Sequence, residues 1–400
     1  MRIIAANNYY YLRGGSERVM FDEERSLRAR GHEVIPYSAW HANNYPAESS
    51  EYFAPQRGAD SSSILHKITS IRAFVNNTRA GSSFAALLDA KHPEVIHCHN
   101  IYGSLTTSIL VEATKREIPA VMTAHDAKLI CPTYLCLDHG KICEACHGKN
   151  YYQAILKNCH AKGIVASSMF ALESYYNSFL KRYETLSRII TPSRFLKELF
   201  IRNGVDEGRL EFIPNGVDVD DLEPQIEPGN YALYVGRLSA EKGVLTLLKA
   251  ITGSGIPLRL VGEGPVRAEA EALAAGSAMI RFEGYKQGSE LSELYRKAAF
   301  VVVPSEWYEN APMSVLESFA HGKPVLGARI GGIPELVRPG ETGELFEPKN
   351  VEELRHSLME LFQNREDLKR RGQRARHLVE QEYSLKLHTD RIIGLYEHLV

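Results

Sequence analysis

The sequence of 400 residues has no long hydrophobic run. Its longest apolar stretches, such as 298–304, fall far short of the ~18 residues that a membrane-spanning helix needs. An excess of one charge is also missing. The formal net charge is −2, so nothing in the composition indicates a nucleic-acid partner. Residues 1–4 open directly into a predicted strand and leave no room for a signal peptide. We therefore expect a cytoplasmic protein that does not bind nucleic acid.

Cysteine is scarce, yet five of the six cysteines fall between Cys131 and Cys159. Cys143 and Cys146 have the spacing of a metal clip, and Cys131 and Cys159 would complete a structural four-cysteine zinc site. A disulfide framework is not expected in the cytosol. Cys136 is a fifth candidate and leaves the ligand set ambiguous. Reduced thiols packed in a loop are the alternative.

Short apolar strands alternate with amphipathic helices along the whole chain, which is typical of βαβ units. In the first half, we predict strands at 2–6, 33–37, 95–98, 120–123, 163–166 and 188–191. In the second half, we predict them at 210–213, 232–235, 258–261, 280–282, 300–303 and 324–328. The chain is too long for one ordinary core, so we predict an α/β protein of two doubly wound domains, 1–205 and 206–383. The Asn215-Gly216 turn marks the hinge.

The most informative stretch, 304–337, holds two carboxylates eight residues apart, Glu309 and Glu317. A helix predicted over 311–321 follows the strand 300–303. The free N–H groups of its first turn and the positive end of its dipole suit a diphosphate. Glu317 is placed to accept hydrogen bonds from a ribose and Glu309 from the sugar being moved. Two ordinary surface glutamates are the alternative.

The surrounding sequence favours the functional interpretation. Glu309 and Glu317, followed by GKPV at 322–325 and GGIPE at 331–335, resemble the signature of the retaining glycosyltransferases of the GT-B superfamily, family 4 (group 1) type. The resemblance implies two Rossmann-like domains that face each other across a cleft. The N-terminal domain would be the acceptor side and the C-terminal domain would bind the nucleotide sugar. The last helix, 384–400, would pack back on the N-terminal domain.

A second cluster, YVGRLSAEKG at 234–243, runs from a strand into a turn with two cations. Arg237 and Lys242 suit the negative charge that grows on a leaving diphosphate, and the resemblance makes them catalytic residues. Gly236 is a substrate-binding candidate in the same turn. A surface Arg and Lys are the alternative.

The N-terminal half offers two further candidates. Gly14 and Gly15 follow the first strand, where glycine lets backbone N–H groups approach an anion. The resemblance implies that this loop touches the donor diphosphate, although a Gly-Gly pair often marks an ordinary turn. His125 follows the strand 120–123, and the family often has a histidine near the donor sugar at this point. A lone histidine is otherwise usually structural.

The remaining substrate-binding candidates lie in loops after predicted strands or at the start of the helix after Glu309. They are Gly264, Tyr285, Asn310, Ala311, Pro312, Met313, Ser314 and Val315. Asp218 and Asp220 have a metal-binding spacing, but they follow the hinge turn, so we reject them as a metal site. No catalytic metal is expected, because the two cations and the helix N-terminus supply the electrophilic help.

The resemblance implies transfer of a sugar from a nucleoside diphosphate sugar to an acceptor hydroxyl, with retention of configuration. The departing β-phosphate oxygen would remove the acceptor proton. The acceptor would be a carbohydrate or a lipid-linked molecule, in polysaccharide or glycolipid assembly. The alternatives are a noncatalytic nucleotide-sugar-binding protein, a zinc-stabilised interaction protein, and an epimerase or phosphorylase of the same architecture.

The segment 61–88 carries three cations and no acidic residue before Asp89, with apolar residues at helical spacing. We expect those apolar residues to face the core. The alternative is a lipid-facing helix and peripheral contact with the inner face of a membrane.

Overall fold

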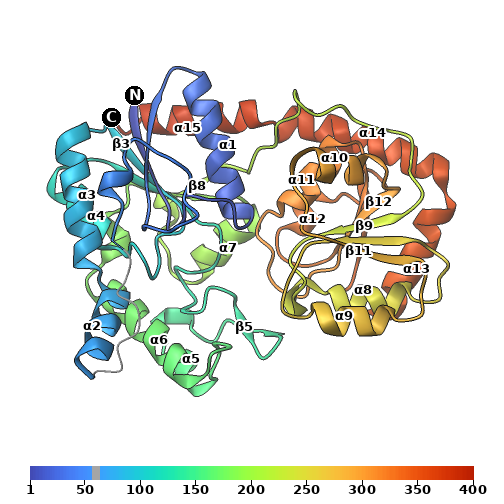
Figure 1. Cartoon of the computed structure of the whole chain (residues 1–400), viewed down its shortest axis with the longest axis horizontal. Helices are drawn as coiled ribbons and strands as arrows, with labels where there is room; N and C mark the ends of the chain where they lie inside the picture. Colours follow the sequence, from blue (N-terminus) through green and yellow to red (C-terminus); the bar gives the residue numbers. More distant parts are fainter. Residues whose placement is uncertain (56–63) are drawn as a thin grey trace. The chain divides into compact units, whose positions relative to one another are not determined.

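The computed structural model describes residues 1–55 and 64–400, with side chains from residue 70 onward in the second range (Figure 1). The chain divides into two compact units. The first comprises Met1–His139, Cys143–Pro214 and Thr389–Val400, and the second comprises Gly140–Ile142 and Asn215–His388. Each unit contains one parallel sheet.

The sheet of the first unit has the strand order β2-β1-β3-β4-β7-β8, with every neighbouring pair parallel. Its strands are β1 (Arg2–Ala6), β2 (Glu33–Tyr37), β3 (Val95–Cys98), β4 (Ala120–Thr123), β7 (Arg188–Thr191) and β8 (Leu210–Phe212). The helices are α1 (Gly15–Ala29), α2 (Ile64–Val75), α3 (Thr78–Lys91), α4 (Ser108–Lys115), α5 (Gln153–Leu156), α6 (Ile164–Phe179) and α7 (Arg194–Arg202). A small hairpin, β5 (Leu137–Asp138) and β6 (Lys141–Ile142), lies between β4 and α5.

The sheet of the second unit has the order β11-β10-β9-β12-β13-β14 and is also parallel. Its strands are β9 (Ala232–Val235), β10 (Leu258–Val261), β11 (Ile280–Gly284), β12 (Phe300–Val303), β13 (Val325–Ala328) and β14 (Gly343–Phe346). Its helices are α8 (Val244–Ile251), α9 (Arg267–Ala274), α10 (Gly288–Arg296), α11 (Met313–Ala320), α12 (Ile333–Leu336), α13 (Val351–Gln363) and α14 (Arg365–Glu382).

The central strands are buried and mostly apolar because helices cover both faces of each sheet; His97 in β3 and Thr123 in β4 are polar. All four residues of β3, β4, β12 and β13 are buried. Parallel strands that are covered on both sides lose the alternation of polar and apolar residues. The short apolar runs of the sequence therefore predict these strands well.

The strand order fixes where a ligand site can form. Counted along the chain, the second sheet has the Rossmann order 3-2-1-4-5-6, which reverses between β9 and β12. The first sheet reverses between β1 and β3. In open parallel sheets, ligands bind beyond the carboxyl ends of the strands at this reversal. The loops after these four strands are therefore the first places to examine.

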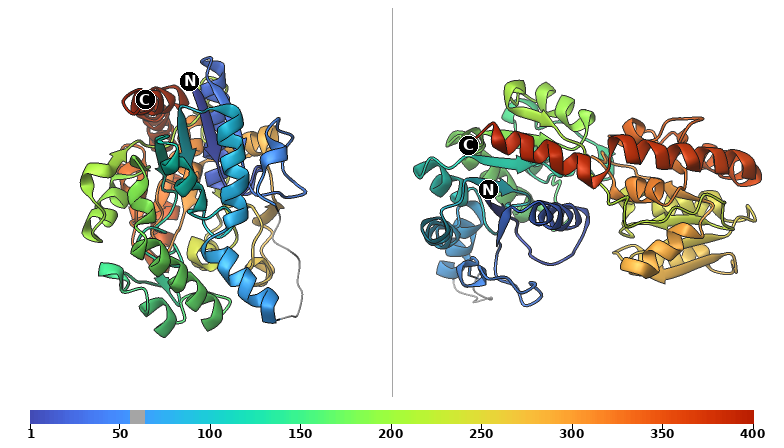
Figure 2. Two further views of the ribbon diagram at one scale, coloured as in Figure 1. Left: turned by 90° about the vertical axis from the view of Figure 1, so that its left-hand side faces the viewer. Right: turned by 90° about the horizontal axis from the view of Figure 1, so that it is seen from above.

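The last helix, α15 (Leu385–Glu397), completes the core of the first unit. Ile392 and Tyr396 are fully buried in one cluster with Ile3 and Val95. The hydroxyl of Tyr396 lies 2.7 Å from Nδ1 of His97. The two ends of the chain consequently lie near each other on the first unit (Figure 2).

Three predictions from the sequence are wrong in detail. Residues 163–166 do not form a strand. They begin α6, and Val165 is 71% exposed, so this β-branched run is not core. The strand predicted at 210–213 is β8, which pairs with β7 in the first sheet. The boundary between the units therefore falls after Pro214 instead of after residue 205. Strand β14 was not predicted.

The packing of α15 yields a stability prediction. Ile392→Ala removes buried methyl groups from the first core and is expected to lower the free energy of unfolding by about 2–4 kcal/mol. Glu397→Ala, an exposed change on the same helix, is the control and should stay within about 0.5 kcal/mol. Denaturant unfolding measures both. Equal effects of the two variants would contradict the role given to α15.

Candidate functional site

Glu309 is a buried carboxylate in the loop that follows β12. It is 5% exposed, and three donors converge on its Oε1 atom. Lys242 Nζ donates at 2.6 Å, the Ser305 hydroxyl at 2.7 Å and the Trp307 indole N–H at 2.8 Å. Burial alone would raise the pKa of Glu309. The Lys242 charge and the three hydrogen bonds outweigh burial, so the pKa lies below its usual value and Glu309 is ionised.

Lys242 reaches Glu309 from the loop that follows β9, so the pair joins the two strands on either side of the chain reversal. The loops are also tied by backbone, since the N–H of Glu306 donates to the carbonyl of Glu241 at 2.8 Å. The Lys242 ammonium lies 5.0 Å from the Trp307 ring centroid. The structure thus brings together two predicted catalytic residues that are 67 positions apart.

The Gly331-Gly332 pair explains how the backbone at Glu309 is held. Gly331 has a φ of +60°, and a Cβ atom there would lie 2.2 Å from the carbonyl oxygen of Glu309. The N–H of Gly332 donates to the same oxygen at 2.8 Å. Only glycine allows both this conformation and this approach. The glycine pair therefore supports the backbone behind Glu309.

Helix α11 begins at Met313, with Pro312 as the preceding cap residue, so the predicted start at Ala311 is two residues early. Glu317 is in the second turn and accepts a hydrogen bond from the Tyr295 hydroxyl at 2.9 Å. The first N–H groups of a helix have no partner within the helix. This end of α11 follows the loop that carries Glu309, and binding of a diphosphate there stays a prediction.

Sequence reasoning missed four residues of this site. Ser305 and Trp307 bind Glu309 directly, and Tyr295 binds Glu317. Asn215 was assigned to the hinge turn. Its side chain is buried and donates to the carbonyl of Ala311 at 3.2 Å, while its Oδ1 meets no donor within the described chain. Ser305 and Trp307 can both donate hydrogen bonds and lie within four residues of Glu309. This was the signal in the sequence that could have identified them.

The other predicted residues of the second unit are spread around these loops. Arg237 is exposed after β9, next to Gly236. A Cβ atom at Gly264 would lie 2.2 Å from the Leu238 carbonyl oxygen, so packing alone accounts for that glycine. Tyr285 is 57% exposed after β11. The predicted substrate contacts of these residues stay predictions.

In the first unit, the half-buried His125 lies beyond the carboxyl end of β4 and begins a chain of polar groups that continues into the core. Its Nε2 lies 2.9 Å from His99 Nδ1. His99 Nε2 lies 3.5 Å from the carboxylate of Glu23, which is also 3.4 Å from His97. A proton on His99 Nε2 would face the carboxylate, so that Nδ1 accepts a hydrogen bond from His125 Nε2. With that proton in place, His125 would be the tautomer that carries its proton on Nε2.

Asp126, beside His125, was also missed. Burial raises its pKa to about 6, although the backbone N–H of Lys128 opposes the shift with a hydrogen bond. A carboxyl group that titrates near neutral pH at the end of a central strand is typical of functional sites. Its position directly after His125 was the signal in the sequence.

Gly14 and Gly15 stand at the start of α1, after β1, as predicted from the sequence. A Cβ atom at Gly15 would meet nothing within 4 Å, so the packing of the protein does not require glycine there. The turn is braced by Asn7, which donates to Glu17 at 3.3 Å, and by Asn100, which donates to Ser16 at 2.9 Å. Whether this loop binds a diphosphate stays a prediction.

The described residues contain one group of three His, Cys, Asp or Glu ligand atoms within 4.8 Å of one another: Glu23, His97 and His99. Both His97 nitrogens already face partners, because Nε2 lies 2.7 Å from the Thr123 hydroxyl and Nδ1 faces Tyr396. Hydrogen bonding within the core therefore accounts for this group.

The four cysteines predicted to bind zinc, together with Cys136, line one small cavity in the first unit. The neighbouring Cys136 thiol and the Thr133 hydroxyl, which lies 3.5 Å from the Cys131 sulfur, lower the pKa of Cys131 to about 6. None of the helices in the described part of the chain has the length and apolarity to cross a bilayer.

Comparison with known proteins agrees with the fold. A family model described as Glycosyltransferase Family 4 matches residues 13–221, and one described as Glycosyl transferases group 1 matches residues 221–378. The fold and these family matches define a glycosyltransferase of the GT-B architecture. Since the first model matches more than half of the chain, the chain belongs to Glycosyltransferase Family 4.

Two curated relatives illustrate the range of sequence identity and coverage. An uncharacterized glycosyltransferase of Methanocaldococcus jannaschii is 24% identical over 416 residues, covering 100% of this chain and 99% of that protein. The sulfoquinovosyl transferase of Arabidopsis thaliana is 32% identical over 233 residues, covering 54% of this chain and 44% of that protein. Against the second relative, the match thus spans less than half of the protein.

Solved structures show the same fold. Sucrose-phosphate synthase from Thermosynechococcus elongatus has a TM-score of 0.73 at 20% identity, covering 100% of this chain and 98% of that one. Anabaena HepE in complex with UDP and glucose has a TM-score of 0.70 at 16% identity, with both chains fully covered.

The ion pair yields a prediction for pH dependence. Because the folded-state pKa of Glu309 is lowered, its contribution to stability is present above the unfolded pKa of about 4.3 and is lost as the pH falls through the folded value. Lys242→Met removes the charge, so the pKa of Glu309 should rise and acid unfolding should begin at a higher pH.

The expected loss of stability for Lys242→Met at neutral pH is about 1–3 kcal/mol, since one partner of a largely buried pair is removed. Thermal unfolding between pH 3 and 8 measures both effects. Lys249→Met, at an exposed position of α8, is the matched control. Acid unfolding at an unchanged pH in Lys242→Met would contradict the assignment.

Proposed function

We propose that the protein is a retaining glycosyltransferase that moves a hexose from a nucleoside diphosphate sugar to an acceptor hydroxyl. The observation that carries the proposal is the buried, ionised Glu309 beside Lys242, at the chain reversal of a Rossmann-ordered sheet and before the N-terminus of α11. The N-terminus of α11, which suits an anion, and the Glu309 carboxylate, which can accept hydrogen bonds from sugar hydroxyls, thus lie in one loop.

In the proposed reaction, the second unit holds the donor. The N-terminus of α11, Arg237 and Lys242 stabilise the diphosphate as its charge grows, and Glu317 binds the ribose. Glu309 accepts hydrogen bonds from the sugar. Because its Oε1 is occupied by three donors, Oε2 is the oxygen that would bind the substrate. The departing β-phosphate oxygen takes the acceptor proton, and no covalent intermediate on the protein is required.

The first unit is proposed to supply the acceptor side. His125 would contact the transferred sugar, with His99 and Glu23 as positioning residues that keep its Nε2 protonated. Gly14 and Gly15 would let backbone N–H groups approach the donor. A divalent cation is not part of this scheme, because the cations named above serve the same electrostatic role.

Glu309→Gln keeps the shape of the side chain but removes its charge. We expect transfer activity to fall by roughly two to three orders of magnitude, as for loss of a preorganised electrostatic contact, while nucleotide binding changes little. Initial rates and nucleotide affinity measure the two effects. Glu269→Gln, an exposed glutamate on α9, is the control. Full activity of Glu309→Gln would contradict the proposed role.

Nucleotide binding tests the donor site separately. We expect one of UDP, GDP, ADP and TDP to raise the melting temperature in the presence or absence of magnesium, because a ligand of the native state stabilises it. UDP is the first choice, since the structural relative HepE was solved with UDP. The failure of all four to stabilise the protein would remove the main support for the donor site.

We also propose a lipid-linked acceptor and peripheral contact with a membrane from the cytoplasmic side. Part of the predicted segment 61–88 lies outside the described residues. In its described part, the Phe74 ring packs edge-on against Phe170. The support comes instead from α6, whose outer side exposes Val165 and Leu172 and ends at Phe179, which is 85% exposed.

Lysines flank this apolar side of α6, at Lys162 and Lys181, as suits an anionic lipid surface. Val165→Ser combined with Phe179→Ser should weaken binding to vesicles that contain phosphatidylglycerol, while activity on a soluble acceptor persists. Leu273→Ser, on α9, is the control. Vesicle sedimentation decides, and unchanged binding by the double variant would contradict membrane contact through α6.

A further inference from the structure

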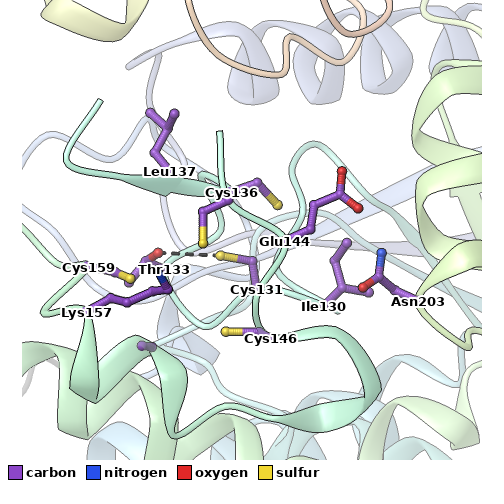
Figure 3. A pocket seen from close by; sticks show the side chains of 12 residues that line it. Ile130, Cys131, Thr133, Cys136, Leu137, Glu144, Cys146, Lys157, Cys159 and Asn203 are labelled. Atoms are coloured by element: carbon purple, nitrogen blue, oxygen red, sulfur yellow. Dashed lines mark hydrogen bonds between the residues drawn. The ribbon is translucent and has the colours of Figure 1, made fainter. Parts of the chain in front are cut away.

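The clustered cysteines belong to a part of the first unit that the glycosyltransferase site does not use. Residues 130–159 follow the end of β4 and contain the hairpin β5–β6 and the short helix α5. Five thiols from this segment line one cavity of about 10 Å³ (Figure 3). All are free cysteines.

The local backbone presents the thiols from three places. The N–H of Cys143 donates to the carbonyl of Cys136 at 2.9 Å, so these two residues close the open end of the hairpin. A turn follows directly, in which the His147 N–H donates to the Glu144 carbonyl at 3.1 Å. Cys146 lies in this turn. Cys131 precedes the hairpin and Cys159 follows α5. A hairpin end with a Cys-x2-Cys turn is a common way to present two thiolates to one ion.

We propose that this cavity is a structural zinc site whose ligands are Cys131, Cys143, Cys146 and Cys159. Thiolates are soft donors, and four of them in tetrahedral geometry select zinc. A space of about 10 Å³ holds the centre of one ion. Binding displaces the thiol protons to solvent, and Lys157, which also lines the cavity, places a positive charge beside the thiolates.

Cys136 is assigned a different role from the other four. Its side chain is only 2% exposed, whereas Cys131, Cys143, Cys146 and Cys159 are all partly exposed. We therefore place Cys136 outside the ligand set, as a thiol buried in the interior beside the site.

The sulfurs are spaced more widely than in a loaded site, because no three of them in the described chain lie within 4.8 Å of one another. A tetrahedral site with Zn–S bonds of about 2.3 Å brings its sulfurs to within about 4 Å. Zinc would therefore contract the segment 130–159 and fix the loop that begins just after His125 and Asp126. The ion would act on stability and loop order and would take no part in transfer.

Metal content of the purified full chain is the first test. We expect one zinc per chain by inductively coupled plasma mass spectrometry, and loss of that zinc in Cys143→Ser and Cys159→Ser. Cys136→Ser and Cys98→Ala, which change cysteines outside the ligand set, should keep it. A chelator should lower the melting temperature of the wild type. Retention of zinc in Cys143→Ser would overturn the assignment. Loss of zinc in Cys136→Ser together with its retention in Cys159→Ser would also overturn it.

Cobalt substitution tests the wild type without any variant that risks misfolding. Removal of zinc under reducing conditions and addition of Co²⁺ should give the ligand-field bands of a tetrahedral site and strong thiolate-to-cobalt charge transfer. The proposal fails if the wild type binds neither zinc nor cobalt, if it carries an iron–sulfur chromophore, or if mass spectrometry finds these cysteines joined in disulfides. None of these results depends on sugar transfer.

Discussion

A single buried carboxylate oxygen organises the second unit. Glu309 stays ionised in the interior because one ammonium and two neutral donors point at its Oε1 atom. Without Lys242, burial would favour the protonated form. The pair also ties the loop after β9 to the loop after β12, which are the two loops at the chain reversal. The charge of the site and the positions of its loops therefore depend on the same contact.

The glycines around Glu309 follow from that constraint. The loop after β13 must pass close enough for the Gly332 N–H to reach the Glu309 carbonyl, and any side chain at Gly331 would collide with it. The backbone is thus held from one side by hydrogen bonding and the side chain from the other by Lys242. These contacts hold Glu309 in one position, which suits a preorganised electrostatic role.

Much of this could be predicted from the sequence, for physical reasons. Buried parallel strands are short apolar runs, so most strands were located to within a residue or two, and loops after strands pointed to Glu309, Lys242 and His125. The run 163–166 was wrongly predicted as a strand because β-branched residues also occur at the start of helices. Strand β8 was placed in the wrong unit, because pairing between strands leaves no trace in a strand's own residues. Ser305, Trp307 and Asn215 were missed because their roles depend on contacts with the Glu309 loop.

The return of the chain to its first unit constrains how the protein is made. Ile392 and Tyr396 complete the core built around β1 and β3, yet they leave the ribosome after the whole second unit. The N-terminal sheet is therefore synthesised first but lacks part of its interior until the second unit has been made. The second unit has all of its own core residues before that point. The order of folding during synthesis is thus expected to reverse the order of the sequence, and the early sheet is the part that chaperones would need to protect.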